Sequence, residues 1–504
     1  MTGAPLDSNV DDTRSMLEAA AAVHGDREAY VESGQVEPGA RITFADWIGR
    51  ARCVAAQFAD LGVGKGDVVM LWLPSGIDYA TCYAAAAMIG AITTGLNPRL
   101  GRREIESILE QADPALIITD ERLGQLPPSA ARRMPRASLT TDTAGSTLPW
   151  ANLTRRDPVA LIFTSGTTGT PKGAVFDADR LAAGAAAAGV MSAPYDRRLT
   201  STPFAHAGYM FKLWDQLVWG SALVVPPAPW SAQGMFDVLC SERVTVAGAV
   251  PTQWAKLLDV DGVSPQALPH LRIGIAATAP APPELVRQVA IRIGVPLVVR
   301  YAMTECPTIC GTEPADPVDV QFRTVGRPAA GMEVRVRPDG GVEVSGPCVM
   351  RGYWRNPELT AEVLRDGWLR TGDIGVLGSD GNLTLVGRSG DMYIRGGYNV
   401  HPGEVERVLV GHPGVKQAAV VGRSAAVIGE IGVACVVPTD GCTPPTLAEL
   451  RTHVAGELAD YKAPDELLIV DELPLTAMLK PDRIAVSELI TLHDKDIQRR
   501  QPAG

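Results

Sequence analysis

The run from Thr164 to Gly173 reads Thr-Ser-Gly-Thr-Thr-Gly-Thr-Pro-Lys-Gly and is rich in groups that bind phosphate. It follows the apolar segment 159–163 and precedes a second apolar segment, 174–176. Backbone N–H groups of a glycine-rich loop and hydroxyl side chains donate hydrogen bonds to a polyphosphate, and a lysine adds positive charge. The run is not a Walker loop, because a proline precedes the lysine and a strand should follow. The candidate phosphate ligands are Thr164, Ser165, Gly166, Thr167, Thr168, Gly169 and Lys172.

Further polar segments follow in order: Tyr-Ala-Met-Thr-Glu at 301–305, Arg-Thr-Gly-Asp at 370–373, Gly-Arg-Ser-Gly-Asp at 387–391 and Pro-Leu-Thr-Ala-Met-Leu-Lys at 474–480. Alone, a Thr-Glu pair is typical of a helix cap and a Gly-Arg or Gly-Asp pair of a turn. In this order, and with residues 164–173, they resemble the motifs of the adenylate-forming superfamily of acyl-CoA synthetases, luciferases and peptide-synthetase adenylation domains. The resemblance covers nearly the whole chain.

The resemblance implies a nucleotide site. Tyr301 would stack on adenine, Thr304 would contact the α-phosphate and Glu305 would help to hold Mg²⁺. Asp373 would bind the ribose hydroxyls, a task that suits a carboxylate acceptor, and Arg388 would lie near ribose and phosphate. The adenine side would also include Ala277, Thr278, Ala279 and Pro280.

The resemblance also implies a catalytic lysine and a gate on the acyl pocket. Lys480 would contact the substrate carboxylate and the α-phosphate, and one such donor is worth about 10²–10³ in rate. His206 would be the gate, although a lone histidine is more often structural. The pocket would be lined by residues 206–214, 250–253 and 276–280. Apolar Met210, Phe211 and Trp214 favour a hydrophobic tail or ring system in the acid.

The same resemblance predicts a mobile lid. Residues 1–390 would form an N-terminal adenylate- and acyl-binding domain, and residues 391–504 a C-terminal lid with Asp391 as the hinge. Gly396 and Gly397 would lie beside the pantetheine tunnel, where a thiol arm must pass close to the backbone without meeting a Cβ atom. Glu404 and Glu406, on the helix that follows, are interpreted as its capping and solvated positions.

Several positions depart from the family pattern. Met478 and Leu479 replace a small residue and a glycine before the lysine, and Ala277 and Thr278 replace a glycine pair near adenine. Arg300 and Ala302 flank Tyr301 where smaller residues are usual. Two interpretations stay open: neutral drift around a working site, or weakened adenylation in an enzyme that mainly converts a preformed acyl adenylate to the thioester.

The function predicted is an AMP-forming acid–thiol ligase that makes an acyl-CoA thioester from a hydrophobic carboxylic acid through an acyl-AMP intermediate. Its cofactors would be ATP/AMP, Mg²⁺ and coenzyme A, and its partners the acid or its acyl adenylate, with a homodimer as a further assembly. Amino-acid adenylation is disfavoured because residues 204–209 contain no aspartate to hold an α-ammonium. A non-catalytic acyl or nucleotide binder is the rival from another class, but it would need neither the lysine, the hinge nor the glycine pair.

The composition fits a protein of this kind. The 504 residues are 46% apolar, enough for more than one core, and the formal charge of −11 argues against a nucleic-acid surface. The eight cysteines include no CxxC pair, which favours reduced thiols over zinc or a disulfide framework. The N-terminus is acidic and lacks an apolar core, and no apolar stretch is long enough to span a bilayer. A cytoplasmic location is expected.

The elements that would position the site follow from periodicity. Residues 43–61 show helical spacing with Thr43 as N-cap, and a strand at 68–73, a helix at 79–89 and a strand at 115–119 follow. Similar alternation at 198–301 and short alternating runs at 325–391 predict an α/β fold: a large N-terminal domain of two α/β layers plus a β-rich subdomain, followed by a small mobile α+β lid. The lid would contain a helix at 402–409, strands at 417–421 and 432–437, a helix at 447–458 and a loose tail at 493–504.

Overall fold

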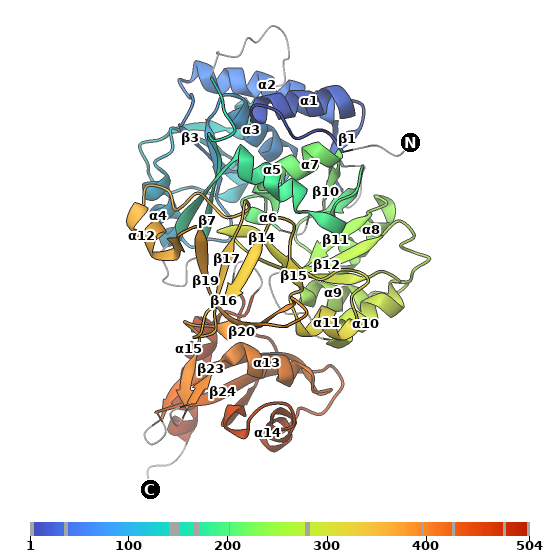
Figure 1. The fold of residues 1–504 in the computed structure, drawn as a ribbon, viewed down its shortest axis with the longest axis vertical. Coiled ribbons are helices and arrows are strands. Elements are labelled where there is room, and N and C mark those ends of the chain that lie inside the picture. Colours follow the sequence, from blue (N-terminus) through green and yellow to red (C-terminus); the bar gives the residue numbers. More distant parts are fainter. Residues whose placement is uncertain are drawn as a thin grey trace.

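The computed structural model describes residues 5–34, 39–140, 152–164, 171–200, 202–277, 283–395, 398–425, 429–476 and 480–500. A large portion formed by the earlier part of the chain occupies one end of the molecule, and a smaller C-terminal unit, drawn in orange to red, occupies the other (Figure 1). The candidate residues outside the described ranges are Ser165, Gly166, Thr167, Thr168, Gly169, Thr278, Ala279, Pro280, Gly396 and Gly397, together with the altered positions Met478 and Leu479.

The first sheet of the large portion alternates strands with helices, as predicted. Helix α2 (Phe44–Asp60) begins at Thr43, whose side chain accepts a hydrogen bond from the Asp46 N–H, as expected of an N-cap. The strands are parallel except for the final pair, which is antiparallel. Their spatial order is β6 (Arg132–Pro135), β5 (Leu116–Thr119), β3 (Val68–Trp72), β4 (Ile92–Gly95), β7 (Pro158–Thr164) and β8 (Lys172–Asp177).

The second sheet is parallel in its middle and antiparallel at both edges. It takes one edge from the beginning of the chain, so the two layers are interleaved along the sequence. Its order is β15 (Arg327–Pro328), β14 (Cys306–Gly311), β13 (Leu297–Met303), β12 (Ile273–Ala277), β11 (Val246–Ala249), β9 (Arg197–Leu199), β10 (Ala222–Val225), β1 (Glu28–Glu32) and β2 (Arg41–Thr43).

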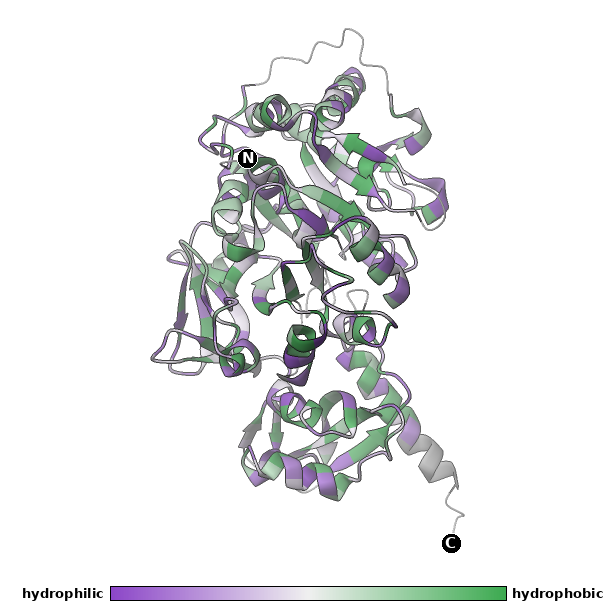
Figure 2. Ribbon diagram, turned by 90° about the vertical axis from the view of Figure 1, so that its right-hand side faces the viewer, coloured by the Kyte–Doolittle hydropathy of each residue, from purple (hydrophilic) through white to green (hydrophobic). Residues whose placement is uncertain are grey.

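The main core lies between these two sheets. Helices α1 (Thr13–His24), α2, α3 (Ile77–Met88), α5 (Ala178–Ala186), α6 (Ala207–Met210) and α7 (Leu213–Trp219) all contribute buried side chains to it. On the outer faces, α4 (Arg102–Ala112) packs on the first sheet, and α8 (Ala232–Ser241), α9 (Pro251–Leu258) and α10 (Pro283–Arg292) pack on the second. In Figure 2 the inner strands are mostly green, consistent with burial on both faces.

A β-rich subdomain completes the large portion. Its antiparallel sheet has the order β16 (Glu333–Val336), β17 (Gly341–Ser345), β19 (Trp368–Leu377) and β18 (Leu364–Arg365), with β20 (Leu383–Arg388) also paired to β19. Helix α12 (Pro357–Val363) lies in one of its connections, whereas α11 (Val318–Arg323) connects β14 and β15 of the second sheet. The sheet carries the segments 370–373 and 387–388 of the candidate nucleotide site.

The C-terminal unit is an α+β fold with its own cores. Its sheet has the order β22 (Tyr398–Val400), β21 (Tyr393–Arg395), β24 (Gly429–Pro438) and β23 (Val415–Ala425), with β25 (Glu466–Ile469) paired to β24. The helices α13 (Pro402–Val410), α14 (Leu447–Ala455) and α15 (Arg483–Arg500) pack around this sheet.

The C-terminal tail differs from expectation. Helix α15 runs to Arg500, so residues 493–500 are helical rather than a loose tail. Its buried residues Val486 and Ile490 pack against β23 and β24. Because the first half of α15 packs against the sheet, the helix continues beyond the last apolar residues of the segment.

Candidate active site

A hairpin formed by β7 and β8 holds the ends of the candidate phosphate loop. Thr164 and Lys172 are register partners at its open end, so both flanks of the candidate loop lie at the edge of the first sheet. The backbone oxygen of Pro171 accepts a hydrogen bond from Gln111 Nε2 at 2.9 Å, which ties the loop's end to α4. The strand expected after the loop is present.

Lys172 and the candidate metal carboxylate, Glu305, both lie near the side chain of Tyr353. Tyr353 donates a hydrogen bond from its hydroxyl to Glu305 Oε1 at 2.8 Å, and the Lys172 ammonium lies 5.9 Å from the centre of its ring. Tyr353 was missed by the sequence reasoning, although it follows a glycine held at φ +147°. Glu305 is 9% exposed, and its Oε2 accepts no hydrogen bond from a described residue. A magnesium ion commonly takes one protein carboxylate and completes its shell with substrate phosphates and water, so this carboxylate fits the ion.

Tyr301, Asp373 and Arg388 form a second cluster, although more than 80 residues separate its ends in the sequence. Asp373 and Arg388 are register partners on β19 and β20, and Arg388 Nε donates to Asp373 Oδ1 at 2.8 Å. The Tyr301 hydroxyl, at the end of β13, donates to Asp373 Oδ2. Burial, followed by the charge of Asp373, raises the pKa of Tyr301 well above its usual value, so the phenol stays protonated. A carboxylate offers about four acceptor positions, so Asp373 retains capacity for ribose hydroxyls.

Lys480 reaches from the C-terminal unit toward the large portion. The ends of its turn are joined by a hydrogen bond from Thr476 N–H to the Lys480 backbone oxygen at 2.7 Å. The ammonium lies within electrostatic range of Arg388, Asp373 and His206. Loss of hydration among protein atoms, followed by the charge of Arg388, lowers the pKa of Lys480. Burial, and after it the positive charge of Lys480, lowers the pKa of His206 to about 4. The imidazole is therefore neutral near pH 7.

His206 begins helix α6 and caps it, because its Nδ1 accepts a hydrogen bond from the Gly208 N–H at 3.3 Å. The structural role foreseen for a lone histidine is therefore present, and it places the ring on the Lys480 side. Thr304 is half-buried in the turn between β13 and β14, next to Glu305.

Asp391, which the sequence predicts to be the hinge, contacts a side chain that the sequence did not single out. Arg483 Nε lies 3.1 Å from Asp391 Oδ2, and the same guanidinium donates to Glu406 Oε1 and Oε2 at 2.7 and 2.9 Å. The expectation that Glu406 is a solvated helix position is therefore wrong. Besides its contact with Arg483, Glu406 accepts a hydrogen bond from the Val420 N–H at 2.7 Å. Glu404 does cap α13, but it is buried and pairs with Lys462 Nζ at 2.7 Å.

The apolar residues expected in the acyl pocket pack in the core. Phe211 contacts the ring of Phe176 at 5.2 Å between centroids, and Trp214 lies under the Arg155 guanidinium at 5.1 Å. Met210, Phe211 and Trp214 are each 0% exposed. They are fully buried core side chains, so they say less about the acid than the sequence suggested. The polar residue in the same segment, Lys212, has a buried ammonium.

Arg300, one of the unusual positions, points away from the nucleotide cluster. Its Nη1 donates to the backbone oxygen of Thr312 at 2.6 Å, and its Cα pairs in register with Ala277 on the neighbouring strand. Ala302 is exposed beside Tyr301. Nothing in the described contacts blocks adenine binding at these positions.

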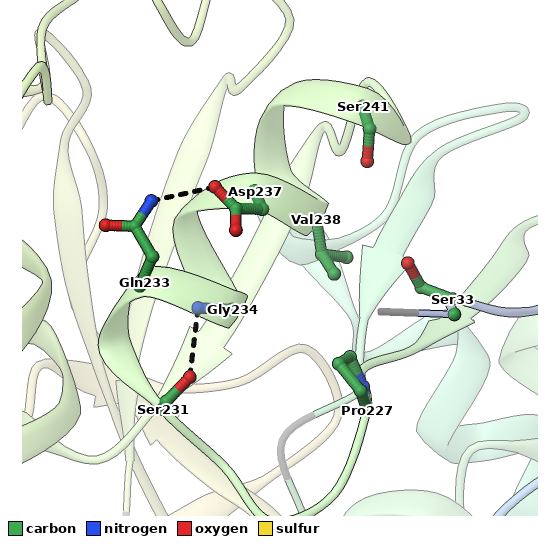
Figure 3. Close-up of a pocket in the computed structure, with 9 residues that line it drawn as sticks. Ser33, Pro227, Ser231, Gln233, Gly234, Asp237, Val238 and Ser241 are labelled. Atoms are coloured by element: carbon green, nitrogen blue, oxygen red, sulfur yellow. Dashed lines mark hydrogen bonds between the residues drawn. The ribbon is translucent and has the colours of Figure 1, made fainter. Parts of the chain in front are cut away.

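A surface hollow of about 310 Å³ lies at another place, beside α8 (Figure 3). Ser231 caps the helix through the Gly234 N–H, and Gln233 bonds Asp237. Among the described residues that line it, none belongs to the candidate site. Its small polar lining offers no converging charges.

Two family models cover these elements. The model for AMP-binding enzyme matches residues 17–354, and the model for AMP-binding enzyme C-terminal domain matches residues 404–480. The chain therefore belongs to the AMP-binding enzyme family, that is, to the adenylate-forming superfamily of acyl-CoA ligases. The predictions of an AMP-forming acid–thiol ligase and of ATP, Mg²⁺ and coenzyme A as its cofactors are confirmed at the level of this family.

Similar proteins extend over nearly the whole chain. An indoleacetate–CoA ligase from Aromatoleum aromaticum is 32% identical, over 92% of this chain and 97% of its own. A sulfoacetate–CoA ligase from Cupriavidus necator is 31% identical, over 94% of this chain and 96% of its own. The structure of o-succinylbenzoate CoA synthetase from Bacillus subtilis with its acyl-adenylate intermediate superposes with a TM-score of 0.82 at 26% identity, covering 94% and 97% of the two chains. The predicted fold class is confirmed.

In the described residues, no helix is long and apolar enough to cross a membrane. The cytoplasmic location, the homodimer and the domain boundary between residues 390 and 391 stay predictions. That boundary falls between the end of β20 and the start of β21.

Proposed function

We propose that the protein makes an acyl-CoA thioester from a carboxylic acid with an apolar body, through an acyl-AMP intermediate, and that it carries out both half-reactions. The observation that carries the proposal is the position of Lys480, which lies within electrostatic range of His206 on the acyl side and of Asp373 and Arg388 on the nucleotide side. An ammonium between these two groups of residues lies where an acid and an α-phosphate would meet.

In the first half-reaction the carboxylate oxygen of the acid attacks the α-phosphorus of ATP, and the bond to pyrophosphate breaks. Tyr301, Asp373 and Arg388 hold the adenosine, and Lys172 and the loop after Thr164 hold the outgoing phosphates. Lys480 neutralises charge that develops between carboxylate and phosphorus. A magnesium ion held by Glu305 would neutralise further phosphate charge. Neutral His206 borders the acyl group without repelling Lys480.

In the second half-reaction the thiolate of coenzyme A attacks the acyl carbonyl, and the bond to the AMP oxygen breaks. The lid turns about Asp391, which withdraws Lys480 and brings Gly396 and Gly397 to the thiol path. These residues lie between β21 and β22, whose ends Arg395 and Tyr398 pair in register. One site then serves two reactions by exchanging the face of its lid.

Relatives act on acids of varied chemistry, as the names indoleacetate, sulfoacetate and o-succinylbenzoate state. An apolar body is supported here by Val250, 8% exposed, in the segment 250–253 expected to border the acyl group. Support for an apolar tail from Met210, Phe211 and Trp214 is reduced, because these side chains pack in the core.

The thioesterification-only alternative is disfavoured by the placement of Lys480, since an ammonium within electrostatic range of both His206 and Arg388 suits the charge that develops during adenylation. The test is to incubate the pure protein with a panel of acids, ATP and Mg²⁺, and to follow pyrophosphate exchange. Acyl adenylates are offered with coenzyme A in parallel, and thioesters are read by mass spectrometry. Exchange together with thioester supports the proposal. Thioester formation from adenylates without pyrophosphate exchange supports the alternative. If neither exchange nor thioester formation is detected, both the proposal and the alternative are wrong.

A further inference from the structure

The Lys212 ammonium is buried without a partner. Its Nζ has almost no contact with solvent and makes no hydrogen bond to any described residue. Complete enclosure by protein lowers the pKa of Lys212, with the charge of Asp215 opposing that effect. A buried, unpaired ammonium is costly, so such a group either stays neutral or awaits an anion.

Lys212 is part of a larger cationic cluster. Asp215 on α7, 1% exposed, uses both carboxylate oxygens elsewhere: Ser192 Oγ donates to Oδ1 at 2.8 Å, and Arg198 Nη1 on β9 donates to Oδ2. Arg198 in turn has two more buried donors, Nε and Nη2, with no acceptor in the described part of the chain. Three buried nitrogen atoms, Lys212 Nζ and Arg198 Nε and Nη2, therefore lack a hydrogen-bond acceptor among the described residues.

The charges of this region do not balance. The charge of Asp215 favours the ammonium of Lys212, whereas the charges of Arg198 and Arg300 oppose it. The nearby thiol of Cys348 is neutral, because burial raises its pKa to about 11. Glu313 pairs with Arg300 at only 3.9 Å and is half exposed. Arg198 and Asp215 form an ion pair, and Glu313 and Asp316 offset the charge of Arg300. A charged Lys212 is therefore the uncompensated cation, in a place from which water is largely excluded and where an anion would be held strongly.

The cluster adjoins the candidate active site. Lys212 lies between α6, which His206 begins, and α7, so it belongs to the segment 206–214 expected to border the acyl group. Arg300 directly precedes Tyr301, whose hydroxyl binds Asp373. Two of the cationic residues are thus direct chain neighbours of the candidate site, Lys212 on the segment that starts with His206 and Arg300 on the strand that carries Tyr301.

From this geometry we infer that Lys212 and Arg198 form a subsite for a second anionic group, a carboxylate or sulfonate, at the far end of the acid substrate. The inference rests on the proposed function and narrows it to acids with an anion at each end and an apolar body between them. The reacting carboxylate would lie toward Lys480 and His206, and the distal anion would accept hydrogen bonds from Lys212 Nζ and the free Arg198 donors. Charged hydrogen bonds of this kind, once buried, dominate specificity, because an analogue without the anion leaves the donors unpaired.

The test compares matched pairs of acids of several lengths, each monocarboxylic acid with its ω-carboxylate and ω-sulfonate counterparts, by kcat/KM for thioester formation. We expect the wild type to prefer the dianionic member of at least one pair by about 30-fold or more. The variant Lys212→Met should lose about that factor on the dianion and change less than about threefold on the monoacid. Lys256→Met, an exposed lysine on α9, is the matched control and should change neither.

A second measurement does not depend on the variant folding. The wild type is heated with ATP and Mg²⁺ in the presence of each acid, and the dianionic acid should raise the melting temperature more than its monoanionic partner. Equal kcat/KM for mono- and dianionic acids in the wild type, at every length, would overturn the subsite while leaving the ligase activity intact. Absence of thioester from every acid would instead overturn the proposed function.

Discussion

The guanidinium of Arg483 contacts the carboxylate of Asp391, with Nε 3.1 Å from Oδ2. Arg483 lies three residues after Lys480, and Asp391 lies at the start of the C-terminal unit. The same guanidinium also donates hydrogen bonds to both carboxylate oxygens of Glu406 on α13. The side chain of Arg483 therefore connects the segment that carries Lys480 to the expected hinge at Asp391. Hinge angle and lysine position are therefore expected to be coupled.

Arg483→Met should slow adenylation by about tenfold or more, since removing the cation frees the lysine segment and leaves two partly buried carboxylates unpaired. Pyrophosphate exchange measures the first half-reaction, and thioester formation from acyl adenylate measures the second. Lys416→Met is the control, because Lys416 forms an exposed ion pair with Asp440 elsewhere in the same unit.

The coupling to Asp391 has its own check. If Arg483 acts through the hinge, Asp391→Asn and Arg483→Met should be non-additive in the rate of exchange, with the double variant close to the worse single one. Additive losses would mean that the two residues act independently and that the contact is incidental.

Lys480→Ala should separate the two half-reactions. Loss of the ammonium is expected to reduce adenylation by about 10²–10³-fold, while conversion of a supplied acyl adenylate to thioester should change little. Leu479→Gly tests the altered turn: it should accelerate adenylation only if the bulky residue before Lys480 impairs the wild type. An equal loss of both half-reactions in Lys480→Ala would contradict the assignment of the lysine to adenylation alone.

Much of the fold follows from the sequence. Thr43 as N-cap, the strands on either side of the phosphate loop and the change to short strands after residue 325 all follow from local periodicity and turn chemistry, which act over a few residues. Periodicity could not show that β1 and β2 join the second sheet, because strand pairing across more than 160 residues leaves no local pattern.

The residues of the candidate site could be predicted from the sequence more readily than the contacts between them. The motifs named Tyr301, Asp373 and Arg388, but their mutual hydrogen bonds depend on the register of β19 and β20. Tyr353, Arg483 and Lys212 were missed, since their roles arise from contacts distant in sequence. The sequence did contain one indication of a role for Lys212. It is the single charged residue in the otherwise apolar and aromatic run Tyr-Met-Phe-Lys-Leu-Trp at 209–214, where a charge does not contribute to core packing.

Asp373→Asn should weaken nucleotide binding. The substitution replaces a charged acceptor that serves both Tyr301 and Arg388, and hydrogen bonds to charged groups are worth about 1.5–3 kcal/mol, or roughly 10- to 100-fold in KM for ATP. Tyr301→Phe removes only the hydroxyl and should cost less. Isothermal titration with ATP gives the affinities, and an unchanged melting temperature would show that the loss is not one of folding. A larger effect of Tyr301→Phe than of Asp373→Asn would contradict the central place given to the carboxylate.

The pH dependence of adenylation should report Lys480. Loss of hydration and the Arg388 charge lower the pKa of this lysine from the ordinary 10.5, and the charged form is the one needed, so activity is present at lower pH and is lost as pH rises through the lowered pKa. The basic limb of the exchange rate is therefore expected below pH 10.5.

Lys480→Arg provides the decisive comparison, because a guanidinium stays protonated in proteins. Its basic limb should move to higher pH whatever its absolute rate, whereas thioester formation from a supplied adenylate should lack this limb in both proteins. His206, with a pKa of about 4, stays neutral through this range and adds no step. A limb that stays at the same pH in Lys480→Arg would assign it to another group and would remove the lysine from the rate-determining chemistry.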